Sequence, residues 1–119
     1  MYANFTPAEH ANFLAAKVVS HATAYLEGRQ DAAELSRNAR SVMLELIAAP
    51  DDPHAKPVLD ASRLLVVAMT GAAWAHEPAR EDRWQQVMSA LVDLVRHESL
   101  RLRLGGPSRG LDPSSMGET

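Results

Sequence analysis

Large apolar residues recur at intervals of three and four along four segments of the chain, and this spacing predicts four amphipathic helices. We expect these helices at about 7–27, 32–48, 57–75 and 78–104. Helices of this kind bury their apolar faces against one another. The pattern therefore predicts an all-α fold, a small four-helix bundle in a single domain, 1–104. In the first, second and fourth helices the predicted inward-facing residues are Ala8, Ala11, Leu14, Ala15, Val18, Val19, Ala22, Tyr25 and Leu26; Leu35, Ala39, Val42, Met43, Leu46 and Ile47; and Trp84, Val87, Met88, Leu91, Val92, Leu94, Val95 and Leu102.

The ends of the helices carry their own signals. The stretches Thr6-Pro7-Ala8-Glu9 and Asp31-Ala32-Ala33-Glu34 are capping boxes, which begin helices. Three prolines within 50–57 predict a loop, because proline does not fit the interior of a helix. From 105 to 119, 9 of the 15 residues are Gly, Pro or Ser, so we expect a mobile C-terminal tail.

The third helix differs from the others because it is apolar on nearly every side between 64 and 75. A helix of that kind is typically covered by neighbours on several sides. Alanines and Gly71 keep its side chains short, so that neighbouring backbones can approach closely.

Several large apolar residues lie in the polar arcs of their helices. Phe13, for example, falls between His10 and Lys17, and Leu44 between Arg37 and Arg40. Single exposed apolar residues are common on any protein. Their presence on every helix, together with the apolar third helix, favours a surface for a second copy of the chain or another protein. The predicted interface residues are Phe13, Leu44, Val67, Trp74, Leu100 and Leu104.

Charge and composition narrow the functional classes. The 119 residues carry a formal net charge of −3, which gives no general attraction to nucleic acids or anionic lipids. The longest stretch without a charge or histidine, 64–75, is shorter than the ~20 residues needed to span a bilayer. The start of the chain has no signal-peptide pattern. We expect a cytoplasmic protein that contacts neither membrane nor DNA directly.

No catalytic or metal-binding pattern is recognisable. Cysteine is absent, and none of the five histidines follows a glutamate by three residues, the spacing that di-metal helical bundles use. The glycines of 105–110 lack the Lys-Ser/Thr pair of a phosphate-binding loop. Arg96, Arg101 and Arg103 match the negative end of the fourth helix. We therefore expect no enzymatic activity, no catalytic residue, no metal and no cofactor.

The small size, the two capped helix starts, the Ala- and Arg-rich helices and the apolar run 64–69 resemble the small helical anti-activators of quorum sensing in Gram-negative bacteria. The resemblance implies a homodimer that binds the ligand-binding domain of a LuxR-type transcription regulator and prevents the receptor dimerisation needed on DNA. The expected function is thus a non-enzymatic protein-interaction module. The alternatives are a structural or adaptor subunit of a larger assembly, or a ligand- or metal-binding helical bundle.

Overall fold

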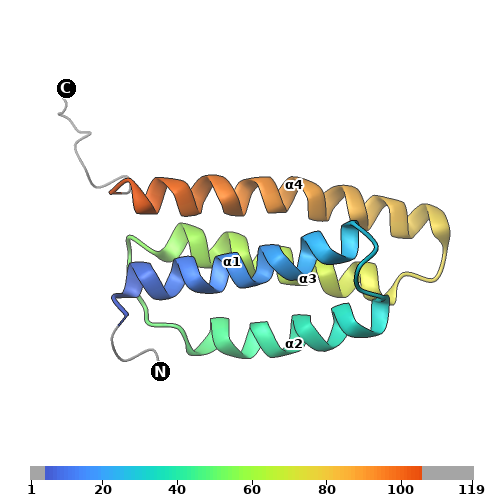
Figure 1. Cartoon of the computed structure of the whole chain (residues 1–119), viewed down its shortest axis with the longest axis horizontal. Coiled ribbons are helices and arrows are strands. Elements are labelled where there is room, and N and C mark those ends of the chain that lie inside the picture. The colour runs from blue at the N-terminus through green and yellow to red at the C-terminus, as the bar shows by residue number, and fades with distance from the viewer. Residues whose placement is uncertain (1–4, 106–119) are drawn as a thin grey trace.

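The computed structural model describes residues 5–105, and these form four α-helices without a β-strand. The helices are α1 (Pro7–Leu26), α2 (Ala32–Ala48), α3 (Lys56–Trp74) and α4 (Pro78–Arg103), as shown in Figure 1. The predicted all-α class is confirmed, and each helix end lies within one residue of its expected position. The predicted mobile tail, 105–119, lies outside the described residues except for Gly105.

Local capping sets the ends of α1 and the start of α2. The Glu9 amide donates to Thr6 Oγ1 at 3.1 Å, and the Thr6 amide donates to Glu9 Oε1 at 2.9 Å. Asp31 and Glu34 repeat this reciprocal pair at 2.8 and 3.1 Å. At the end of α1, Gly28 takes a positive φ of 79°, so that two amides beyond the helix can bond back to its last turn. These contacts satisfy backbone groups that the helix itself leaves without partners.

The four helices are not equivalent in the bundle. α1 and α3 each pack against the three other helices, whereas α2 and α4 lie along opposite edges of the molecule (Figure 1). The apolar α3 therefore has neighbours on several sides, as its sequence predicts, but Leu64, Val67 and Trp74 on its outer side remain exposed. Its buried residues fill half of its circumference, and Leu65, Val66 and Met69 lie at the centre of the core.

The edge positions of α2 and α4 explain the main errors in the predicted core. Ile47, Val87 and Leu94 were expected to face inward, but all three are exposed, and Leu91 is only half-buried. A helix with two close neighbours buries a narrower arc than a helix with three. The residues at the margins of the predicted stripes consequently remain at the surface. The fully buried residues of α4 are Met88 and Val95.

His10 shows the opposite error. It was expected on the polar face of α1, yet it is only 8% exposed. The ring of Phe5, which precedes the helix, lies 6.4 Å from the His10 ring in an edge-to-face arrangement. The residues before α1 therefore cover a position that a helical wheel of α1 alone places in solvent.

Candidate interaction surface

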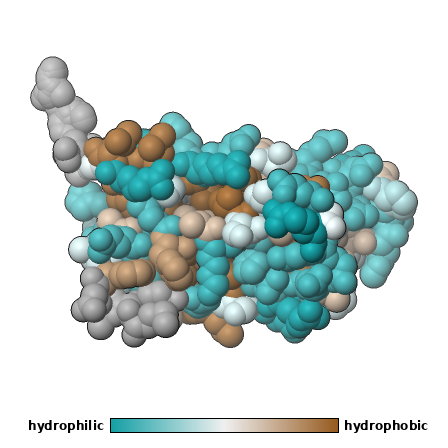
Figure 2. All heavy atoms as spheres, in the orientation of Figure 1, coloured by the Kyte–Doolittle hydropathy of each residue, from teal (hydrophilic) through white to brown (hydrophobic). Residues whose placement is uncertain are grey.

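The six predicted interface residues are all exposed. Their exposed fractions range from 41% for Phe13 to 70% for Leu104. The structure does not gather them on one surface, however. Val67 and Trp74 share the outer side of α3, Leu44 lies on the outer side of α2, and Leu100 and Leu104 end α4. Figure 2 shows hydrophobic atoms over that end of α4.

Phe13 has a partner within the chain. Its ring and that of Phe5 lie 5.8 Å apart with an interplanar angle of 65°, a favourable edge-to-face geometry. Both rings are partly exposed at the start of α1. The exposure of Phe13 thus belongs to a small aromatic cluster that also shields His10.

The contact between α3 and α4 is built around Gly71. A Cβ atom at Gly71 would lie 2.5 Å from Cε2 of Trp84, so the indole ring occupies the space that any side chain there would need. The ring fixes which side of α4 faces α3. Trp84 itself is half-buried and packs on the core.

From this contact, two apolar stripes run along the outer side of the pair. On α3, Leu64 and Val67 precede Gly71 by seven and four residues, and Trp74 follows it by three. On α4, Val87 and Leu94 follow Trp84 by three and ten residues. Steps of three, four and seven keep residues on one side of a helix. We call the exposed residues of these stripes the α3–α4 face: Leu64, Val67, Trp74, Val87 and Leu94.

Only part of this face was predictable from the sequence. Val67 and Trp74 were predicted as interface residues, Val87 and Leu94 were placed in the core, and Leu64 was not singled out. The face residues recur at intervals of three and four in the sequence, but the buried residues of a helix recur at the same intervals. Only the position of α4 at the edge of the bundle distinguishes the two cases.

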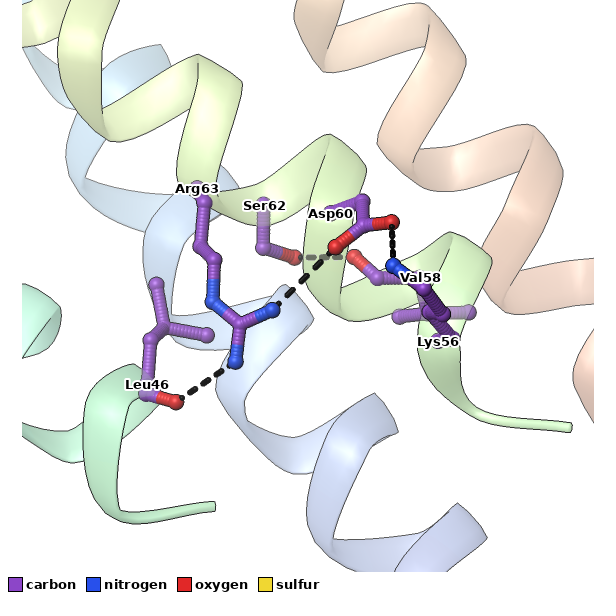
Figure 3. Close-up of polar contacts among 6 residues, drawn as sticks. All are labelled: Leu46, Lys56, Val58, Asp60, Ser62 and Arg63. Atoms are coloured by element: carbon purple, nitrogen blue, oxygen red, sulfur yellow. Dashed lines mark hydrogen bonds and ion pairs between the residues drawn. The ribbon is translucent and has the colours of Figure 1, made fainter. Parts of the chain in front are cut away.

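A cluster of charges lies in the first part of α3, before Leu64 in the chain (Figure 3). Asp60 accepts from Lys56 Nζ at 2.8 Å and from Arg63 Nη1 at 3.2 Å, while Arg63 Nη2 donates to the Leu46 carbonyl of α2 at 3.0 Å. The hydrogen bond from Lys56, and then the charges of Lys56 and Arg63, lower the pKa of Asp60. Beyond this cluster, no charged residue occurs on α3 from Leu64 to Trp74.

A second feature is an open groove of about 410 Å³ between α1 and α4. Its lining combines four small aliphatic residues with three residues that carry hydroxyl groups and three arginines. Figure 2 looks onto this side, where hydrophobic atoms show between hydrophilic ones. The lining residues are Ala15, Ala16, Val19, Ser20, Thr23, Arg29, Val95, Arg96, Ser99 and Arg103.

Two side-chain hydrogen bonds hold α1 and α4 together along this groove. Ser99 Oγ donates to Asn12 Oδ1 at 2.6 Å, and the Tyr25 hydroxyl donates to Glu81 Oε2 at 2.6 Å. Burial, followed by the hydrogen bond to Glu81, raises the pKa of Tyr25. The α1–α4 contact is therefore partly polar, unlike the α3–α4 contact.

A half-buried polar network lies between α1 and α2. Lys17 Nζ and Glu45 Oε2 form an ion pair at 2.7 Å, and His21 Nδ1 lies 3.2 Å from Gln30 Nε2. Burial and the nearby charge of Lys17 lower the pKa of His21. Among residues 5–105 no three His, Asp or Glu side chains come together as metal ligands. The Lys17–Glu45 ion pair connects α1 to α2.

Comparison with known proteins adds no relative: no family model matches the chain, and neither a curated protein nor a solved structure matches it significantly. The class that the coordinates define is a four-helix bundle with α1 and α3 at its centre. None of the helices in the described part of the chain has the length and apolar character needed to cross a membrane.

Proposed function

We propose that this protein is a non-enzymatic interaction module that forms a homodimer through the α3–α4 face. The observation that carries the proposal is that five large apolar side chains from two neighbouring helices remain exposed to solvent. The largest exposed apolar patch on a typical monomer is often functional. Trp74, which is 65% exposed, is also of the residue type most enriched among interface anchors.

The chemistry of the face favours a second copy of this chain as its occupant. A two-fold interface brings the same surface together twice, so any charge on it would meet an identical charge nearby. The α3 stripe from Leu64 to Trp74 is uncharged, and the Lys56–Asp60–Arg63 cluster, which contains both signs, lies at its end. The α3 half of the face can therefore pack on its own copy without like-charge repulsion.

The energetics also favour two copies over a single small ligand. Ten half-exposed side chains, five from each copy, would give ~7–15 kcal/mol on burial. Association costs ~4–15 kcal/mol in lost freedom. A partner without matching apolar residues would bury only the five side chains of one copy, and the favourable free energy of burial would be half as large. The balance predicts a dimer that dissociates on dilution.

The test is sedimentation velocity at protein concentrations from 1 to 100 micromolar, with circular dichroism to confirm helicity. We expect the unmodified chain to sediment as a dimer at protein concentrations of about 10–100 micromolar. Leu64→Asp and Val67→Asp should sediment as monomers with unchanged helical content, because both residues are exposed in the bundle.

Leu44→Asp is the matched control. It places the same charge at an exposed leucine on α2, a helix that contributes no residue to the α3–α4 face. We expect this variant to remain dimeric. The proposal is wrong if the unmodified chain is monomeric throughout, or if Leu44→Asp dissociates the dimer as strongly as Leu64→Asp does.

The resemblance to quorum-sensing anti-activators supports a finer proposal about the protein partner. In this proposal the partner is a LuxR-type transcription regulator, whose dimerisation and DNA binding the bundle blocks. Size, capping boxes and the apolar α3 support it. The test is a DNA mobility shift with a purified LuxR-type receptor. Added protein should release the receptor from DNA, and an unchanged receptor–DNA complex would refute this partner.

A further inference from the structure

We propose that the groove between α1 and α4 binds a small aliphatic carboxylate. This inference is independent of the dimer, because none of the groove's lining residues belongs to the α3–α4 face. The volume of about 410 Å³ lies within the range of ~300–1,000 Å³ that is typical of small-molecule sites.

The charge of the groove indicates an anion. Three of its ten lining residues are arginines and none is acidic, although the whole chain has a net charge of −3. Arg29 is partly neutralised, because it donates twice to Glu27 Oε1, at 3.0 and 2.6 Å. Within residues 5–105, Arg96 and Arg103 form no ion pair. These two guanidinium groups are available to a ligand.

Their positions on α4 allow them to act together. Arg96, Ser99 and Arg103 are spaced by three and four residues, so they share the side of α4 that faces the groove. A guanidinium group binds a carboxylate through two parallel hydrogen bonds. The Ser99 hydroxyl gives its proton to Asn12, so its remaining capacity is that of an acceptor. The arginines therefore supply the donors for the ligand's anionic head.

The aliphatic residues of the groove indicate the chemistry of the ligand beyond its anionic head. Ala15, Ala16, Val19 and Val95 are aliphatic and small, and no aromatic ring lines the groove. This lining suits an unbranched hydrocarbon chain, whereas a planar ring would have no surface on which to stack. From Ala15 to Thr23 the groove follows α1 over nine residues, a rise of ~12 Å. An extended chain of medium length fits along that distance.

The test is an isothermal titration of the full chain with octanoate as the probe, supported by amide chemical shifts. We expect saturable binding in the micromolar to low millimolar range, with the largest shift changes along α1 and α4. Arg96→Gln and Arg103→Gln should each weaken binding by about tenfold, the effect of losing one charged hydrogen-bonded contact. Arg83→Gln removes an exposed arginine of α4 outside the groove and should leave binding unchanged.

Two further ligands and one further variant test the two halves of the site. Octanol, which lacks the charge, and inorganic sulfate, which lacks the chain, should each bind at least tenfold more weakly than octanoate. Ala16→Leu should block the groove while the melting temperature is maintained, because Ala16 is exposed in the bundle. The proposal is overturned if octanoate does not bind saturably, if octanol or sulfate binds equally well, or if Arg83→Gln weakens binding as much as Arg96→Gln.

Discussion

The long helix α4 contacts α3 along one side and α1 along another, and these two contacts are filled in different ways. Against α3, the indole of Trp84 covers Gly71 at a distance that leaves no room for a methyl group. Within residues 5–105 no side-chain hydrogen bond joins α3 to α4. Against α1, small residues on both helices leave a groove, which the Ser99–Asn12 and Tyr25–Glu81 hydrogen bonds accompany.

The difference shows how one helix can serve two purposes. A large residue placed against a glycine closes a contact and creates a continuous apolar surface beside it. Small residues placed against small residues leave open space that a ligand can occupy. The first contact depends on shape and the second on a few polar bonds, so the two should respond to different perturbations.

The largest expected effect comes from Gly71→Ala. The new methyl group must displace the Trp84 ring, three atoms of which lie within 2.7 Å of the added Cβ, so the cost should be about 3 kcal/mol. Only ~1 kcal/mol of this is recovered from the higher helix propensity of alanine. We expect a lower free energy of unfolding in urea denaturation. In a Trp84→Ala background the same change should instead be stabilising, because the ring is absent. A stabilising effect in both backgrounds would show that the indole does not fill this space.

An intermediate effect is expected from Ser99→Ala. This substitution removes the hydrogen bond from Ser99 to Asn12 and should lower the free energy of unfolding by ~0.5–1.5 kcal/mol. Ser89→Ala, at an exposed position of α4, is the matched control and should change stability little. Equal effects of the two substitutions would mean that the Ser99–Asn12 bond does not stabilise the α1–α4 contact.

The smallest effect is a pH dependence specific to the α1–α4 contact. Burial and Glu81 raise the pKa of Tyr25 above its usual value of 10.0. A raised folded-state pKa stabilises the fold fully below the unfolded-state pKa, and this contribution is lost as the pH rises through the folded-state pKa. We expect the melting temperature of the unmodified chain to fall more between pH 9 and 11 than that of Tyr25→Phe. Identical curves would show that Tyr25 does not contribute to this loss.

The fold was predictable because its main determinants are local. The capping boxes at Thr6 and Asp31 and the prolines between α2 and α3 identify helix ends from a few neighbouring residues. The periodic apolar positions identify the faces, and the central residues of each stripe, such as Leu14 and Val42, are indeed buried.

The candidate surface was only partly predictable, because it depends on which helices become neighbours. The sequence places Val67 and Trp74 at the surface of α3, and the structure agrees. It could not show that Val87 and Leu94 join them, since that follows from the position of α4 at the edge. The groove carried no sequence signal, because its arginines and small residues come from α1, from the turn after α1 and from the distant α4.

The bond from Arg63 to the Leu46 carbonyl has a consequence for how the bundle unfolds (Figure 3). The last turn of α2 contains no basic residue, and Arg63 of α3 supplies a cation to the Leu46 carbonyl, which also accepts the Ala49 amide. Fraying of α2 must break this bond, and detachment of α3 exposes the end of α2. The two helices should therefore lose their protection against hydrogen exchange together, as one cooperative unit.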